Sequence, residues 1–541
     1  MGRAFALFLV GSLAFAVGLM LPAARHAAEG SEGAVPVFGS RTAYLAEGAA
    51  LTIRSVSGGN VWWALRSGPL KDAGRDVVSV PVTADRAYTE RLVSIPTSVA
   101  WKHPLPGLPS AMVLRAAEMR PDGMLGPSAM FTALFTRHEL PVVSLLVEDG
   151  AFFDPDTGIY VVGHAALRPS PEMEAMHRQD GRWWKYPGNF HFRGGEWERA
   201  GAMQLIGNDG EQLFSAKVRI RVNGQMTRGF PQHALRLYFD EPIGTGFFPD
   251  GDGLGTRSLV LRTSGNDQMY ALLRDGLAQH ICADGPFLTA ASMPCVVYVN
   301  GAYWGIHQLQ QRIDEREIAR RFGVPRKQVA LLQMENGRFA GHKEAAAFEQ
   351  AVGSIGAMDP TDEDFPRTAE ALIDMEGFLR YMAAVMVLDN SDWPENNVRV
   401  WRYIGGDRSE GPLDGRWRFI LNDMDLGLGA NTAPDAPIDL RLRSNGMIAR
   451  LFRHCMRSPV LEAAFRHAVD DFLQERLLSG RAEDLLEGIV GSMEGEMPRH
   501  VARWRRPSSV QAWHKEVEKV ARYLRERPRY IMQQHRDDRS N

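Results

Sequence analysis

Short apolar stretches broken by Gly, Pro and Asp fill the chain from about residue 34 to residue 136. They are rich in Val, Leu, Ile and Trp, a composition typical of strands. The clearest are Leu51–Val56, Val61–Leu65, Val77–Val82 and Ala111–Ala116. Several short strands at this spacing predict a small β-sandwich over residues 34–136. The stretch carries no evident catalytic cluster, so we expect it to be structural or adhesive.

A second β-rich region is expected from about residue 140 to residue 310. Ala216–Val222 alternates strictly between apolar and charged residues. The two-residue period of a strand puts its cations on one face, and these are Lys217, Arg219 and Arg221. Ala234–Phe239 alternates too and carries Arg236 among apolar neighbours. Further on, Asn300-Gly301 separates two apolar runs, which is the strongest short-range signal for a hairpin.

Helical spacing of apolar residues takes over in the second half of the chain. The sequence predicts a buried helix at Phe378–Leu388 and a nearly all-helical region over residues 446–534. Two more helices are predicted at Tyr270–Cys282 and Asp314–Phe322. A strand hairpin is predicted from Val398–Tyr403 and Trp417–Leu421. Together these patterns indicate an α+β protein with a β-sandwich at its start and helices at its end.

The beginning of the chain determines the expected compartment. After Arg3, the residues from Ala4 to Ala24 carry no charge. This run is long for the core of a signal peptide and just long enough to span a bilayer. We expect residues 1–30 to be either a cleaved signal peptide or an uncleaved membrane anchor, and the rest to be exported to an extracellular, periplasmic or membrane-anchored location facing outside the cytoplasm.

The amino-acid composition limits the kinds of molecule that the protein is expected to bind. The formal net charge is −3, so no basic surface invites nucleic acid. The chain has three cysteines, too few for a disulfide framework, and no Cys/His spacing indicates a zinc site.

Two acidic segments carry the strongest candidate chemistry. In Asp389–Asn397, Asp392 is followed five residues later by Asn397, and in Asn422–Gly429 two aspartates precede glycines. Protein-kinase-type phosphoryl-transfer sites follow this order: an Asp orients the acceptor hydroxyl, and a later Asn and Asp hold metal ions. Asp, Asn and Pro between apolar runs also form ordinary loops, so the motif alone leaves both interpretations open.

Five motifs in order resemble the CotH kinase family, the spore-coat-type secreted protein kinases. They are Lys217–Asp240 with Arg228-Gly-Phe-Pro-Gln-His-Ala-Leu-Arg, Arg262–Asp275, Val299–Ile306 with Arg312-Ile-Asp314, Asp392–Asn397 and Asp423–Gly427. The resemblance covers residues 140–534: a β-rich N-lobe to about 310, a catalytic lobe over about 311–445 and C-terminal helices over about 446–534. Residues 34–136 are more weakly similar to the chitobiase/β-hexosaminidase C-terminal-like domain.

The resemblance implies an atypical protein-kinase-like fold that uses ATP and a divalent metal, Mg²⁺ or Mn²⁺. Carried over by motif, Asp392 is the catalytic acid of the loop. Asn397 and Asp423 are metal ligands, and Asp425 is the second candidate for the metal aspartate.

This chain departs from the family pattern at two positions. His233 stands where a Lys is usual, and Gln311 stands where a Glu is usual. A neutral imidazole pairs poorly with phosphate, because unperturbed His titrates near ~6.5. Lys217 and Arg236, on neighbouring strands, are the cations expected to reach a nucleotide instead, although a row of charges is also typical of a solvated strand face.

The expected function is therefore an exported kinase that phosphorylates Ser or Thr hydroxyls of an envelope or surface protein. The alternative is a weakened or inactive pseudokinase with a structural or polysaccharide-binding role at the cell envelope, which the loss of Lys and Glu favours.

Overall fold

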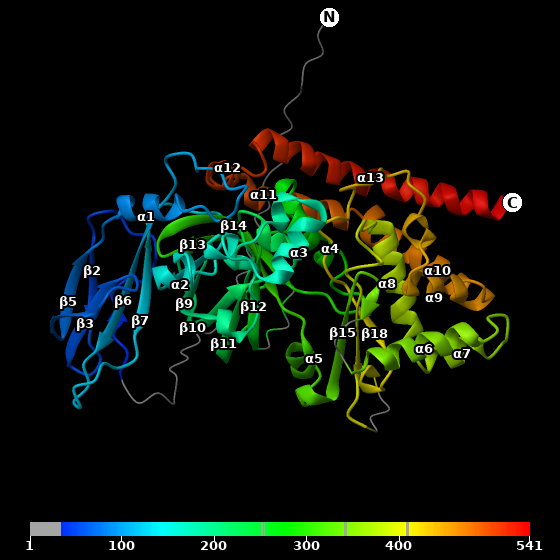
Figure 1. Ribbon diagram of the computed structural model, residues 1–541, viewed down its shortest axis with the longest axis horizontal. Coiled ribbons are helices and arrows are strands. Elements are labelled where there is room, and N and C mark those ends of the chain that lie inside the picture. The colour runs from blue at the N-terminus through cyan, green and yellow to red at the C-terminus, as the bar shows by residue number, and fades with distance from the viewer. Residues whose placement is uncertain are drawn as a thin grey trace, which may run out of the picture.

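The computed structural model describes residues 34–540 except 250, 252, 254, 340–342 and 407–410, and side chains as far as residue 534. Three parts follow one another along the molecule: paired β-sheets, a seven-stranded barrel and a mainly helical part (Figure 1). The mixed α+β architecture agrees with the sequence prediction.

Two antiparallel sheets form the N-terminal part. One has the order β1-β2-β5 and the other β4-β3-β6-β7. Their bounds are β1 (Val37–Phe38), β2 (Ala50–Arg54), β3 (Asn60–Leu65), β4 (Lys71–Arg75), β5 (Val77–Pro81), β6 (Ala111–Glu118) and β7 (Ala129–Leu134), with α1 (Arg86–Val93) after β5. Alternate residues of β2, Leu51 and Ile53, point inward and share one core with Leu114 and Phe131 of the other sheet. Two sheets that pack face to face are the arrangement of a sandwich; the boundaries 34–136 stay a prediction.

The central barrel is closed in the order β10-β11-β12-β14-β13-β8-β9. Its strands are β8 (Val142–Val147), β9 (Arg199–Ile206), β10 (Gln212–Val222), β11 (Leu235–Ile243), β12 (Thr256–Arg262), β13 (Ser292–Val299) and β14 (Ala302–Gln311). Inward-facing apolar residues fill the interior, among them Ile220, Leu237, Leu261 and Trp304. The predicted hairpin joins β13 and β14: Asn300 and Gly301 both have positive φ, 51° and 85°, as a two-residue hairpin turn requires. Closure leaves the barrel no free edge.

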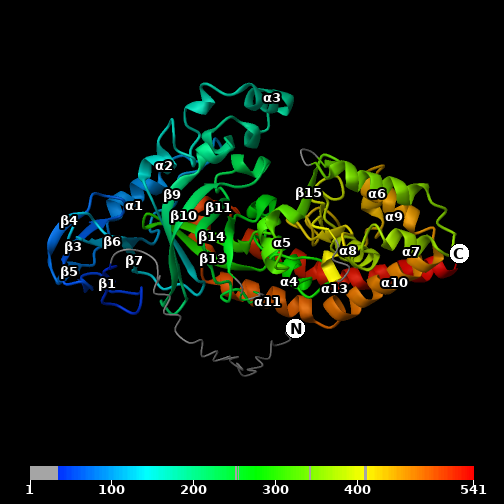
Figure 2. The same ribbon diagram turned by 90° about the horizontal axis from the view of Figure 1, so that it is seen from below.

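A long connection leaves the barrel between β8 and β9. It carries α2 (Asp149–Phe153) and α3 (Pro171–Asp180), and α3 projects away from the body of the molecule (Figure 2).

The predicted helix at Tyr270–Cys282 is shorter than expected. The helix α4 (Arg274–Ile281) begins four residues later. The carboxylate of Asp267 takes the backbone N–H groups of Ala271, Leu273 and Arg274, with distances of 3.1, 2.9 and 3.0 Å. A buried side chain that captures these N–H groups holds the preceding segment as a loop.

A small antiparallel sheet, β16-β15-β17-β18, forms the heart of the third part. Its strands are β15 (Val329–Glu335), β16 (Arg338–Phe339), β17 (Arg399–Tyr403) and β18 (Arg418–Ile420), so the predicted β17–β18 pairing is present. The helix α5 (Glu315–Arg321) precedes the sheet, and α6 (Ala345–Ala357), α7 (Phe365–Glu370) and α8 (Met375–Leu388) lie between β16 and β17. Nearly every side chain of α8 is buried, as expected of a helix that is apolar all round.

The C-terminal helices surround α8 and cover one side of the barrel. They are α9 (Met447–Cys455), α10 (Pro459–Phe472), α11 (Arg481–Glu494), α12 (Met497–Trp504) and α13 (Val510–Ser540), with one π-helical turn at Leu473–Leu478. The long helix α13 runs from the barrel across to the far end of the molecule (Figure 1).

One arginine of α13 fixes the end of α8. Arg527 is fully buried and donates to the carbonyl oxygens of Met386 and Val387 at 3.3 Å each. It also donates to Pro434 O at 3.0 Å, and Tyr523 Oη donates to Val387 O at 2.9 Å. A cation is favourable at a helix C-terminus, where carbonyls lack helical partners. The acidic loop that follows α8 therefore starts from a fixed point.

Across residues 34–540, the gaps excepted, the helices fall short of the length and apolarity that a membrane crossing needs. The apolar run at Ala4–Ala24 lies outside the described residues.

We predict that Arg527→Met lowers the free energy of unfolding by about 3 kcal/mol or more, because it leaves several buried carbonyls without a donor. Tyr523→Phe, which removes one neutral hydrogen bond to the same carbonyl, should cost about 1 kcal/mol. Urea denaturation followed by circular dichroism compares the two variants. Equal losses would contradict the central role of the guanidinium.

Candidate active site

The acidic loop begins where α8 ends. Asp389 terminates the helix in the left-handed region, with φ 47°. Its carboxylate, almost fully buried, takes two hydrogen bonds from Arg441, Nε to Oδ1 at 2.9 Å and Nη2 to Oδ2 at 3.1 Å. This fork geometry satisfies both carboxylate oxygens. Asp389 therefore has a structural role, because its carboxylate anchors the start of the loop to Arg441.

Asp392, Asn397 and Asp423 lie together, as the spacing of the two motifs led us to expect. The Asn397 amide donates to Asp392 Oδ2 at 3.4 Å and to the backbone oxygen of Asp423 at 3.3 Å. Asn396 donates to the other oxygen of Asp392 at 3.1 Å, and Asn390 donates to Asp423 O at 2.7 Å. Side-chain amides thus tie the first acidic segment to the second.

The half-buried carboxyl of Asp392 has a raised pKa. Burial is the main cause and the nearby charge of Asp423 adds to it, while the amides of Asn396 and Asn397 work against it. A partly exposed carboxylate with a raised pKa is suited to accept a proton or a hydrogen bond from a hydroxyl.

The backbone is strained at the same place. Asn397 and Asp423 adopt positive φ, 64° and 52°, in addition to Asp389. Asn and Asp tolerate the left-handed region better than other residues with side chains, yet each such residue costs free energy. Strain gathered around a cluster of polar side chains is characteristic of functional sites.

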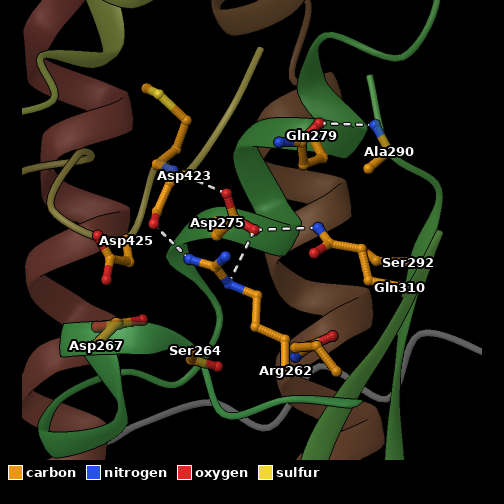
Figure 3. A network of polar contacts seen from close by, with 12 residues as sticks. Arg262, Ser264, Asp267, Asp275, Gln279, Ala290, Ser292, Gln310, Asp423 and Asp425 are labelled. Carbon is orange, nitrogen blue, oxygen red and sulfur yellow. Dashed lines mark hydrogen bonds and ion pairs between the residues drawn. The ribbon is translucent and has the colours of Figure 1, made fainter. Parts of the chain in front are cut away.

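A buried ion network supports the second acidic segment (Figure 3). Arg262, at the end of β12, forms an ion pair with Asp423 and another with Asp275, 3.3 Å from Nε to Oδ2. Asp275, on α4, accepts hydrogen bonds from the Met424 backbone at 2.8 Å and from Gln310 at 3.1 Å. Burial alone would lower the pKa of Arg262, but Asp275, Asp423 and Asp425 outweigh it and raise that pKa. The network fixes the turn that carries Asp423 against the barrel.

Asp425 has a different environment from Asp423. Its residue is 3% exposed, whereas the side chain of Asp423 is 33% exposed. Its Oδ2 accepts from the backbone and side chain of Asn266 at 2.6 and 3.1 Å. Gly265, with φ 56°, leaves room for it, because a Cβ there would collide with the Asp425 carboxylate. Burial, and then the charge of Asp423, raises the pKa of Asp425 well above its usual value, although Arg262 opposes this.

A divalent metal would fit at Asn397 and Asp423. Among the described residues, no three His, Cys, Asp or Glu side chains are grouped so as to hold a metal by themselves. Mg²⁺ in nucleotide sites commonly takes only one or two protein ligands and completes its shell with phosphates and water. An accessible carboxylate beside an amide is such a partial set. Asp425 is the weaker candidate because its carboxylate is almost fully buried and already accepts two hydrogen bonds from Asn266.

The four residues expected to face a nucleotide are dispersed. Lys217 is exposed on the outer face of β10. Gln311 is buried at the end of β14, where its Oε1 accepts from Arg321 at 2.9 Å. Arg236 lies on the outer face of β11 and donates to Asn223 at 2.7 Å. Of the four, Arg236 comes nearest to Arg262 in register, because it pairs with Val260, two residues before Arg262 on the same face.

His233 belongs to the core. It is fully buried, its ring centroid lies 4.4 Å from that of Tyr160 and 4.9 Å from that of Phe190, and its Nε2 contacts Thr97 O at 3.0 Å. Burial is the main reason that its pKa falls to about 3. The imidazole is therefore neutral at physiological pH and adds no positive charge to a phosphate site.

Sequence reasoning assigned no role to Arg262 or Asp275, although both fall inside motifs quoted for the family resemblance. No local spacing links residues 262, 275 and 423, and only the fold brings them together. The available signal was an Arg ending an alternating strand and an Asp opening a helix, both common in other contexts.

We predict that Asp425→Asn stabilises the protein increasingly as pH rises. An Asp whose pKa is raised on folding favours the protonated native state, so wild-type stability declines from about pH 4, where the unfolded chain ionises, toward the native pKa. Asn keeps the side-chain oxygen without the charge. The thermal midpoint of the variant should exceed that of wild type at pH 8, and the gap should narrow toward pH 4.5.

Asp439→Asn, which changes an exposed acid in the same part of the chain, serves as the control and should show no such trend. A midpoint of Asp425→Asn that lies below wild type by the same margin at both pH values would refute the prediction.

Comparison with known families agrees with this geometry. The CotH kinase protein family matches residues 220–531, more than half of the chain. The match includes Arg262, Asp275 and both acidic segments. No curated protein matches the chain, and the N-terminal sheets are not identified by these comparisons. The chain belongs to the CotH kinase family.

Proposed function

We propose that this chain is an exported atypical protein kinase that transfers the terminal phosphate of ATP to Ser or Thr hydroxyls of an envelope or surface protein. The observation that carries the proposal is the joining of Asp392, Asn397 and Asp423 by direct hydrogen bonds. Family membership supports the reaction class.

Each residue has a distinct role in this proposal. Asp392 accepts a hydrogen bond from the acceptor hydroxyl and orients its oxygen toward the phosphate. Its raised pKa suits it to take up the proton as the new ester bond forms. The side-chain oxygens of Asn397 and Asp423 hold the divalent metal, Mg²⁺ or Mn²⁺, which when bound neutralises charge on the phosphates. Catalysis then rests on positioning and charge neutralisation.

Arg262 and Asp275 act as positioning residues. Arg262 contacts the carboxylate of Asp423, and Asp275 holds both Arg262 and the backbone next to Asp423. The guanidinium limits where the Asp423 carboxylate can lie, so that a metal meets it in one orientation.

Export is proposed from the uncharged run at Ala4–Ala24, and the protein substrate follows from that location. The two N-terminal sheets are the candidate for a polysaccharide contact at the same surface.

A second candidate is a pseudokinase that keeps the fold without transfer. The specific observation in its favour is His233, whose neutral, core-packed ring occupies the position of the family's usual Lys. In that case the protein serves the envelope as a structural component.

Phosphate transfer distinguishes the two candidates. With Mg²⁺ or Mn²⁺ and ATP, we expect mass spectrometry to find phosphate on the protein itself or on a generic acceptor protein. Asp392→Asn should lower the rate by about 10²–10⁴-fold, because general-base contributions have this size, while thermal stabilisation by Mg-ATP persists. Asp423→Ala should lose both transfer and the metal-dependent stabilisation.

Asp439→Asn provides the matched control, since it removes an exposed carboxylate that pairs with Arg443 instead of with the hydrogen-bonded cluster. Absence of transfer in wild type, with Mg-ATP binding retained, would replace the kinase with the pseudokinase. Transfer that persists in Asp423→Ala would remove the assigned metal role.

A further inference from the structure

Three arginines gather on the outer face of the barrel next to the acidic cluster. Arg236 of β11 pairs in register with Val260 of β12, which pairs with Gln310 of β14. Arg312 follows Gln310 by two residues and so continues the same face. Arg399 of β17 approaches from the other sheet and donates from Nη2 to Ile313 O at 2.6 Å.

The cluster has fewer acids than cations. Its carboxylates are Asp314, which forms an ion pair with Arg312, and Glu315, whose charge also acts on Arg399. Arg236 instead donates to the neutral oxygens of Asn223 at 2.7 Å and Tyr238 at 3.2 Å. Among the described residues, the buried Nε atoms of Arg236 and Arg399 find no hydrogen-bond partner. Burying guanidinium groups without compensating carboxylates is costly.

The pKa values of neighbouring groups reflect the excess of positive charge. Burial, followed by the charge of Arg312, lowers the pKa of Arg236. Burial would raise the pKa of the Tyr238 phenol, yet Arg236 and Arg312 bring it below its usual value. A local excess of positive charge with open donors is suited to an anion of high charge.

The cluster borders the catalytic residues on two sides. Arg399 is two residues from Asn397 along the chain. Arg262, which contacts Asp423, is two residues along β12 from Val260, a step of about 7 Å. An anion held by the arginines therefore lies beside the proposed metal ligands.

A cavity of about 800 Å³ opens next to the cluster. Its lining includes Ser258, the register partner of Tyr238, and Asp314, the partner of Arg312. A space of this size accommodates a nucleoside.

We propose that Arg236, Arg312 and Arg399 bind the phosphate groups of the nucleotide and replace the ammonium group that this chain lacks at position 233. This inference rests on the proposed function and names the residues that hold its donor substrate. Guanidinium groups bind phosphate oxygens through paired N–H donors, so three of them supply the charge and geometry that one lysine would supply as a point charge.

The arginines are better placed than Lys217. Lys217 lies on the outer face of β10, four residues from Arg221, the register partner of Arg236, which amounts to about 13 Å along the strand. The site should consequently distinguish nucleotides by their number of phosphates, with ATP bound more tightly than ADP and ADP more tightly than AMP.

Titration calorimetry on the full-length protein tests this proposal with Mg-ATP, Mg-ADP and adenosine as ligands. Arg312→Gln, Arg399→Lys and Arg236→Gln should each weaken Mg-ATP binding about tenfold or more, since each removes charge-assisted or bidentate hydrogen bonds. Adenosine affinity should stay unchanged. Arg367→Gln, which alters an exposed arginine of α7 paired with Asp364, is the matched control and should bind like wild type.

The outcomes separate this inference from the kinase itself. Arginine-dependent ATP binding without phosphate transfer would support the inference and remove the proposed activity. Unchanged ATP affinity in all three arginine variants would overturn the inference and leave the activity standing. Arg312→Gln alters a side chain that is 26% exposed, so it carries the test if the variants of the more buried arginines fail to fold.

Discussion

One guanidinium group joins the barrel to the second acidic segment. Arg262 sits at the end of β12 between Asp275 of α4 and Asp423. Removing one member of such a buried network leaves the others charged and unpaired, which costs far more than the network contributes as a whole. The position of Asp423, and hence of everything that depends on it, follows from this arrangement.

The first acidic segment of the site is also fixed by arginine and asparagine side chains. Asp389 is held by Arg441, and the end of α8 is held by Arg527. Asn390 and Asn397 then bind the backbone of Asp423. These contacts join segments that are distant in the sequence, and together they hold residues in backbone conformations that an unsupported loop would avoid. The polar cluster is thus imposed by its surroundings before any ligand arrives.

Much of this could be predicted from the chain, because the informative patterns are local. Strict alternation identified β10 and β11, Asn300-Gly301 identified the hairpin, and a largely apolar run interrupted by Arg380 identified α8. The five-residue interval from Asp392 to Asn397 could be read directly. Contacts between residues that are far apart in the sequence could not be predicted in this way. Arg262 and Asp423 are 161 positions apart, and nothing near either one indicates the other. The burial of His233 could not be predicted for the same reason, because Tyr160 and Phe190, which pack against its ring, are distant from it in the sequence.

The helix α13 has a mechanical consequence. Its 31 residues extend about 47 Å and contact both halves of the molecule. Trp513 donates to Ala271 O at 2.9 Å and Glu516 pairs with Arg274 at 2.8 Å near the barrel, while Arg527 holds α8 further along. The helix therefore acts as a strut. A hinge motion that separated the α4 segment from α8 would have to break these bonds together, so α13 makes the frame around the acidic loop stiff.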